Sequence, residues 1–233
     1  DGRVAAVTDE PITGTEEIDA TGNWVLPGLI DIHTHYDVEV LTAPALTESL
    51  RHGVTTVVVG SCSLSTVHVD GEEAGDLFGR VEAIPREFVI AAVEEHKDWS
   101  NAEEYIRALE ARPLGPNITA FIGHSDMRAA AMGLERATTH DDQPTAAELA
   151  QMERWLTDAL DAGFIGLSSQ QLLFDRLDGE VCRSRTLPST YVKRREMRRL
   201  ARLVRERGRV LQSGPDITHP MKMVLALLRS IGG

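Results

Sequence analysis

The chain has 233 residues, 42% of them hydrophobic, and a formal net charge of -12 at pH 7. This length can bury a sizeable core, as one large domain or as part of something bigger. The acidic charge argues against nucleic acid or an anionic membrane as a partner, and no apolar run predicts a transmembrane helix or a signal peptide. We therefore expect a cytoplasmic protein, in which Cys62 and Cys182 are too few for a disulfide framework.

The first 26 residues alternate short apolar pieces with turn residues. The pieces at Arg3–Val7 and Glu17–Asp19 predict two short strands. We expect residues 1–26 to be part of an N-terminal β-subdomain that begins before residue 1. We expect residues 27–233 to form a second unit, in which the pattern of apolar residues is different.

From Leu29 onward, short β-branched runs alternate with helical segments, which indicates parallel βα units. The predicted strands are Leu29–His33, Thr55–Gly60, Ile118–Gly123, Phe164–Ser168 and Arg209–Gln212. The predicted helices are Ala43–His52, Arg86–Glu95, Asn101–Ala111 (capped by Ser100), Ala146–Ala162 (capped by Thr145), Arg194–Arg207 and Pro220–Ile231.

Two α/β folds fit this alternation. One is an open doubly wound sheet, and the other is the first five βα units of a (β/α)8 TIM barrel, which needs about 250 residues for all eight units. Because the chain also begins inside a subdomain, we favour the N-terminal portion of a barrel, cut at both ends.

The first apolar strand, LPGLIDIHTH, delivers His33 and His35 at its C-terminal end. Residues i and i+2 of a strand point to the same side, so both rings can converge on one metal ion. The acidic neighbours Asp31 and Asp37 could orient a ring through its second nitrogen. The alternative is a pair of surface histidines.

Further polar residues follow the next three strands. Cys62 comes just past the second strand, at the edge where the two histidines emerge, and could join them on a metal. His124 follows the third strand and is either a structural histidine or a group that supports the ligands or contacts substrate. Ser168 and Ser169 at the fourth strand could bind a substrate carboxylate, although capping of the next segment is favoured.

The remaining sequence features do not point to a further functional site. Basic residues concentrate between positions 193 and 209, on a helix whose Met197, Leu200 and Val204 face the core, which favours a solvated face over a nucleic-acid patch. We find no pattern of a serine hydrolase or of a nucleotide-binding loop.

At these residues the chain resembles the amidohydrolase superfamily and, within it, the N-acyl-D-amino-acid deacylase (D-aminoacylase-like) group. The resemblance rests on VLPGLIDIHTHYD, HGVTTVVVGSCSLS, GHSDMRAAAMG and AGFIGLSSQ. It implies a metal-dependent hydrolase with a TIM-barrel fold, one or two Zn²⁺ ions, and His33 and His35 as ligands. It also implies that the Cys62 thiolate takes the ligand position that other members give to a carbamylated lysine.

The sequence departs from the family pattern at strand five. A histidine is expected there, but the chain has Gln212 and Ser213, with His219 a few residues on. Gln212 and His219 thus become candidates for supporting the ligands or contacting substrate, and the second metal site is altered. The resemblance places the general-base aspartate after strand eight, beyond Gly233.

The activity that the resemblance implies is zinc-dependent hydrolysis of an amide bond by metal-activated water. The expected substrate is an N-acyl-D-amino acid or a related small amide. One alternative is a cyclic-amide hydrolase of the dihydropyrimidinase or hydantoinase type, but the lysine that this type needs on strand four is absent from FIGLSSQ. The other alternative is a degenerate, non-catalytic metal-binding barrel.

Overall fold

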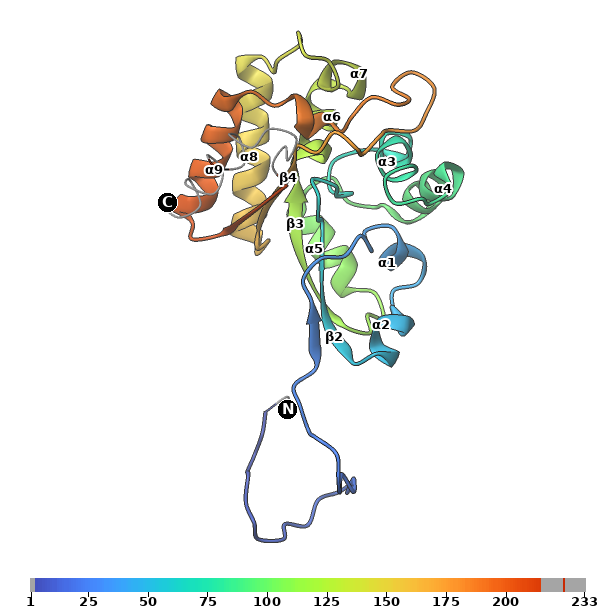
Figure 1. Ribbon diagram of the computed structural model, residues 1–233, viewed down its shortest axis with the longest axis vertical. Coiled ribbons are helices and arrows are strands. Elements are labelled where there is room, and N and C mark those ends of the chain that lie inside the picture. Colours follow the sequence, from blue (N-terminus) through green and yellow to red (C-terminus); the bar gives the residue numbers. More distant parts are fainter. Residues whose placement is uncertain (1–2, 215–223, 225–233) are drawn as a thin grey trace.

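Five parallel strands form one sheet in the computed structural model, which describes residues 3–214 and residue 224 (Figure 1). They are β1 (Leu29–Asp31), β2 (Val54–Val59), β3 (Asn117–Gly123), β4 (Gly166–Gln170) and β5 (Val210–Gly214). The strands lie side by side in chain order, each parallel to the next. A doubly wound sheet reverses its strand order, so this order excludes that fold and agrees with the first five strands of a (β/α)8 barrel.

All five predicted strands are confirmed, with small shifts at their ends. Nine α-helices and one 3-10 helix are described within residues 3–214. They are α1 (Glu39–Thr42), α2 (Thr47–Arg51), α3 (Gly71–Phe78), α4 (Arg86–His96), α5 (Ala102–Glu110), α6 (His124–Met132), α7 (Leu134–Ala137), α8 (Ala146–Ala162), η1 (Pro188–Tyr191) and α9 (Arg194–Glu206). In the described part of the chain, none of the helices is both long and apolar enough to cross a membrane.

The prediction of one helix over Ala43–His52 is wrong. The predicted segment contains one short helix, α2; the helix α1 ends at Thr42, before the segment begins, and residues 43–46 lie between the two. Pro44 disfavours a helical conformation in the residue before it, and Leu46 adopts a left-handed backbone with φ 42°. Both features break the helical path, so only the second half of the predicted segment is helical.

Helix α8 shows why the amphipathic pattern predicted it well. Thr145 accepts a hydrogen bond from the amide of Glu148, whose carboxylate accepts one from the amide of Thr145, which completes a capping box. The apolar stripe is buried at Leu149, Met152, Leu156 and Leu160. For α5 the cap is Asn101 rather than Ser100, because Asn101 accepts from the amide of Glu104.

The N-terminal segment contains no strand in its described residues 3–28, so the strands predicted at Arg3–Val7 and Glu17–Asp19 are not found. Figure 1 shows this segment projecting away from the sheet. Val7 is 94% exposed and Trp24 is 88% exposed, so neither packs on the body. The assignment of residues 1–26 to a β-subdomain stays a prediction, and the helix predicted at Pro220–Ile231 lies outside the described residues.

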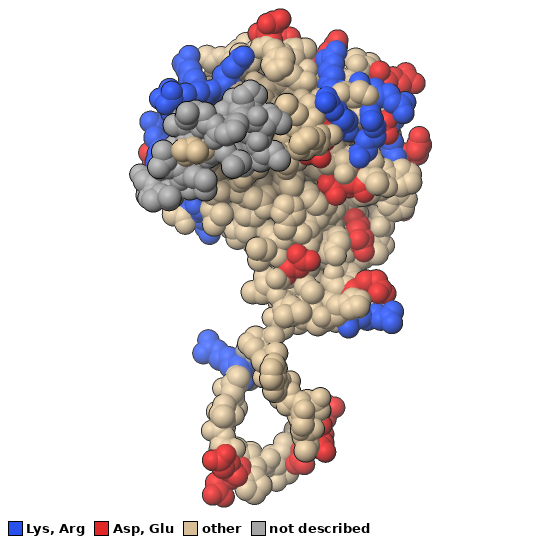
Figure 2. Space-filling model, viewed as in Figure 1, with Lys and Arg blue, Asp and Glu red and all other residues tan. Residues whose placement is uncertain are grey.

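The basic side chains of α9 lie on a solvated face of the helix, as expected. Leu200 and Val204 are buried, whereas Arg199 and Arg207 pair with Glu153 and Asp161 of α8. Figure 2 shows the basic side chains in separate groups with acidic residues nearby. This arrangement gives no support to a continuous nucleic-acid surface.

Candidate metal centre

Three metal-binding side chains converge at the C-terminal ends of β1 and β2. His33 and His35 follow β1 and Cys62 follows β2, and the donor atoms of the three residues lie within 4.8 Å of one another. The Sγ atom of Cys62 is 3.2 Å from Nε2 of His33. The structure therefore brings together the three predicted ligands, hereafter the His–Cys cluster. Two imidazoles and a thiolate are donors suited to zinc.

The carboxylate beside this cluster comes from Glu82, in the segment after α3. Its Oε1 is 3.4 Å from Nδ1 of His35, an electrostatic contact rather than a well-aligned hydrogen bond. A proton on Nδ1 is stabilised by this carboxylate, which leaves Nε2 free to bind a metal. The two expected carboxylates lie elsewhere: Asp31 accepts from the amide of His33, and Asp37 from the amide of Gly60.

The electrostatics of the cluster favour a bound cation. Burial, together with the neighbouring His33, lowers the pKa of His35 to about 4, so this ring is neutral at physiological pH. Burial and the nearby carboxylates of Glu82 and Asp175 raise the pKa of the Cys62 thiol to about 11. Burial and Asp175 also raise the pKa of Glu82 to about 7. A metal ion that binds here must therefore displace the thiol proton.

Gln212, in the middle of β5, lies against the backbone of the cysteine. Its Oε1 accepts a hydrogen bond of 2.9 Å from the amide of Cys62, and its Nε2 lies 3.4 Å from Oγ of Ser61. The side chain thus reaches the loop that carries a predicted ligand, which agrees with the expected supporting role. His219, the other candidate from this region, lies outside the described residues.

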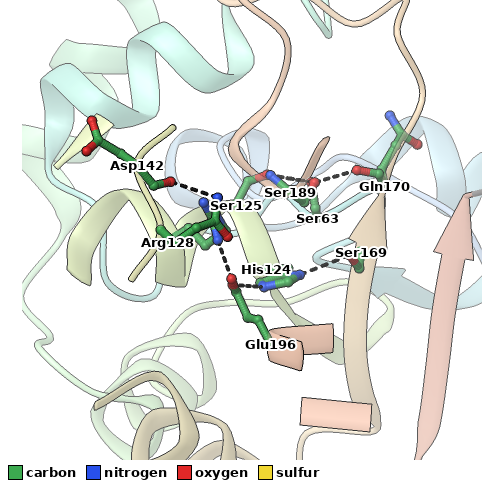
Figure 3. Close-up of polar contacts among 10 residues, drawn as sticks. Ser63, His124, Ser125, Arg128, Asp142, Ser169, Gln170, Ser189 and Glu196 are labelled. Atoms are coloured by element: carbon green, nitrogen blue, oxygen red, sulfur yellow. Dashed lines mark hydrogen bonds and ion pairs between the residues drawn. The ribbon is translucent and has the colours of Figure 1, made fainter. Parts of the chain in front are cut away.

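His124 belongs to a separate, fully buried network (Figure 3). Its Nδ1 lies 3.0 Å from Oγ of Ser169, and its Nε2 lies 2.9 Å from Oε1 of Glu196. Glu196 also pairs with Arg128, and both His124 and Arg128 have no exposed surface. Both ring nitrogens thus have protein partners, which supports the structural alternative for His124. We call these four residues the His124 network.

A group of buried serines lies beside the His124 network (Figure 3). The hydroxyl oxygens of Ser63, Ser125 and Ser189 lie 2.8 to 3.1 Å from one another. Ser168 accepts from the amide of Ser63 and donates to the carbonyl of Gly60. Neither Ser168 nor Ser169 caps a helix, so the favoured interpretation of this pair is wrong.

Sequence reasoning missed two carboxylates that matter here, Glu82 and Glu196. Neither lies at a strand end: Glu82 follows α3, and Glu196 is in the first turn of α9. Glu196 lies among basic residues, and the predicted helix includes it, but only the fold shows that its side chain is 3% exposed. A single acidic residue in the first turn of an arginine-rich helix is the one signal that the sequence offered.

Residues 16–214 match the model of the amidohydrolase family. The chain is 52% identical over 233 residues to an uncharacterised protein of Mycobacterium tuberculosis, covering 99% of this chain and 38% of that protein. It is 36% identical over 168 residues to an N-acyl-D-glutamate deacylase of Alcaligenes xylosoxydans xylosoxydans, covering 72% of this chain and 31% of the enzyme.

The solved structures that the chain resembles include enzymes of the same kinds. A D-aminoacylase with a binuclear metal centre matches with a TM-score of 0.56 and 27% identity over 79% of this chain and 33% of the other. An N-acyl-D-glutamate deacylase from Bordetella bronchiseptica, solved with zinc and a phosphonate inhibitor, matches with a TM-score of 0.56 and 27% identity over 80% of this chain and 33% of the other. The chain thus spans about a third of the length of these relatives.

Proposed function

Because the chain belongs to the amidohydrolase family, we propose that it supplies the His–Cys half of a zinc-dependent site that hydrolyses a carbon–nitrogen bond of a small amide. The observation that carries this proposal is the convergence of His33, His35 and Cys62 within 4.8 Å at the C-terminal edge of a parallel sheet. That edge is where the active sites of barrel enzymes lie.

The residues present fit the ion that the family implies. The two imidazoles and the thiol would hold it, and Glu82 would fix the orientation of His35 from behind. When bound, zinc activates water and polarises the scissile carbonyl. The raised pKa of the thiol means that this chain must release a proton to complete the ligand set, so binding strengthens as pH rises.

The substrate that we propose is an N-acyl-D-amino acid. Support comes from the matched relatives, which are named N-acyl-D-glutamate deacylase, N-acyl-D-aspartate deacylase and D-aminoacylase. Zinc as the metal is supported by the Bordetella structure and by the thiolate in the donor set. The cytoplasmic location stays a prediction.

Two rival functions remain for the test to separate. A hydantoinase-type enzyme needs a lysine on β4, whose sequence is GLSSQ, and here a cysteine in the turn after β2 is close to the histidines instead. A degenerate metal-binding barrel is favoured by one observation, that β5 carries Gln212 where the resemblance leads us to expect a histidine.

The experiment measures metal content in the purified wild-type chain and in Cys62→Ala and His33→Ala, with Cys182→Ala as the matched cysteine control. We expect about one equivalent of zinc in the wild type and in Cys182→Ala, and a loss in the other two. Hydrolysis of N-acyl-D- and N-acyl-L-amino acids and of a hydantoin is then assayed on a protein that includes the complete barrel. A folded wild type without zinc would refute the metal site, and zinc without hydrolysis would establish the degenerate barrel.

A further inference from the structure

The turn after β2 holds two consecutive residues in an unfavourable backbone conformation. Cys62 has φ 53° and Ser63 has φ 71°, both in the left-handed region that residues with a side chain rarely adopt. Such residues persist only where their surroundings fix them, and they concentrate at functional sites. The thiol of the His–Cys cluster is thus carried by a strained turn.

Each strained residue has its amide held by a side chain from a different strand. The amide of Cys62 donates to Oε1 of Gln212 on β5 at 2.9 Å, and the amide of Ser63 donates to Oγ of Ser168 on β4 at 3.0 Å. Ser168 and Gln212 are direct register partners in the parallel pairing of β4 with β5. Two neighbouring strands therefore offer two acceptors, side by side, to two consecutive amides.

The turn is also held from its other end. Ser168 donates its own hydroxyl proton to the carbonyl of Gly60 with a distance of 2.5 Å, and Ser63 contacts the hydroxyls of Ser125 and Ser189. These four serines are buried. Gly60 has φ 75°, and a Cβ atom there would lie 2.0 Å from the carbonyl oxygen of Phe121, so no other residue fits at this point.

We propose that Gln212 and Ser168 are paired positioning residues, which fix the Cys62–Ser63 turn so that the thiol faces His33 ready to bind a metal. The inference rests on the proposed function in one respect, that Cys62 is a metal ligand. Gln212 does not ligate the ion itself, because its carbonyl oxygen is engaged by the amide of Cys62 and its nitrogen lies near Ser61. It acts through the backbone that carries the ligand.

Titration with Co²⁺ tests this proposal, because a bound thiolate gives a charge-transfer absorption band that reports on the sulfur–metal bond itself. The main variant is Gln212→Met, which keeps the length of the side chain and removes the acceptor. We expect about ten- to hundredfold weaker Co²⁺ binding and a weaker band at saturation. Gln212→Glu keeps an acceptor at the same place, so the band should return to wild-type strength.

Two further variants make the test specific. Ser213→Ala changes the next residue of β5, which is exposed, and should match the wild type in affinity and band. Gln212→Asn shortens the side chain by one methylene group and should weaken Co²⁺ binding, as Gln212→Met does. It takes the place of Gln212→Met in the test if that protein does not fold.

The outcomes separate this inference from the proposed function. A Gln212→Met protein that melts earlier but binds Co²⁺ with wild-type affinity and an unchanged band would overturn the positioning role, since Gln212 would then support only the fold. A wild-type chain with neither binding nor a band would refute the metal site itself, and this inference with it. Weaker binding and a weaker band in Gln212→Met, with both restored in Gln212→Glu, would support the inference.

Discussion

The molecule carries two histidine clusters at the same edge of its sheet, and they differ in what their polar atoms contact. In the His–Cys cluster, His35 is 19% exposed and its Nε2 is turned away from the carboxylate beside it. In the His124 network, both ring nitrogens have partners and no side-chain surface of His124 is exposed. The comparison teaches that a histidine at a strand end is a ligand candidate only if the fold leaves one of its nitrogens without a protein partner.

The two clusters also respond oppositely to pH. Burial raises the pKa of Glu196, but its contacts with His124 and Arg128 outweigh this, so the pKa lies below its usual 4.5. A carboxyl with a lowered pKa stabilises the fold above its unfolded value, and that stability is lost as pH falls through the folded pKa. The Cys62 thiol has a raised pKa instead, so its neutral form stabilises the fold at lower pH, and that contribution is lost as pH rises through the folded pKa of about 11.

The largest expected effect comes from Glu196→Gln, which breaks the His124 network and leaves the charge of Arg128 buried without its partner. We expect a loss of about 3–5 kcal/mol in the free energy of unfolding, measured in urea, and an unchanged affinity of the folded protein for metal. Asp161→Asn, at the exposed pair with Arg207, is the matched control and should cost less than about 1 kcal/mol. A variant that stays stable but loses metal would contradict the claim that the His124 network supports the fold and not metal binding.

Glu82→Gln should have the reverse pattern. Metal affinity should fall about ten- to hundredfold, or about 1.4–2.7 kcal/mol, because His35 loses the carboxylate that orients it. The metal-free protein should not be destabilised, since burial raises the pKa of Glu82 and the amide avoids the cost of a buried charge. Isothermal titration beside urea unfolding measures both, with the exposed Glu87→Gln as control. Unchanged affinity would contradict the role given to Glu82.

The third prediction concerns the pH dependence of metal binding at the His–Cys cluster. One thiol proton must leave when the ion binds, so affinity should rise about tenfold, or about 1.4 kcal/mol, for each pH unit below the pKa of about 11. Titrations at several pH values above neutrality measure this slope. His35 is already neutral there, because its pKa is about 4. A flat profile would show that Cys62 does not bind as a thiolate.

The smallest effect is expected from Thr145→Ala, which removes the capping box of α8 away from both clusters. The free energy of unfolding should fall by about 1 kcal/mol. Metal affinity should not change, and the measurements are those used for Glu196→Gln. A change in metal affinity here would mean that a general loss of stability also weakens metal binding. The effects of the other variants on affinity could then not be assigned to their own contacts.

The sequence predicted the sheet and the convergence of the His–Cys cluster better than it predicted their surroundings. Five apolar runs flanked by turn residues sufficed for five strands, because a buried parallel strand needs little else. His33, His35 and Cys62 could be grouped because parallel strands end at a common edge. Glu82 could not, since it lies in an irregular segment whose path no periodicity encodes.

Two local errors have physical causes. The predicted helix over residues 43–52 failed in its first half because Pro44 disfavours a helical conformation in the residue before it. The strands predicted before residue 28 require partner strands, and the described part of the chain offers none to them. Short apolar pieces alone therefore predicted strands that the described residues 3–28 do not contain.

The hydrogen bond between the amide of Cys62 and Gln212 joins residues separated by 150 positions. During synthesis the N-terminal parts of a chain emerge and begin to fold first, but this contact cannot close before β5 has left the ribosome. Residues 33, 35 and 62 emerge early, whereas the turn that presents the thiol is secured late. Cys62 is thus synthesised 150 residues before the side chain that holds its amide, and the turn that carries the thiol is completed only when the fifth strand forms.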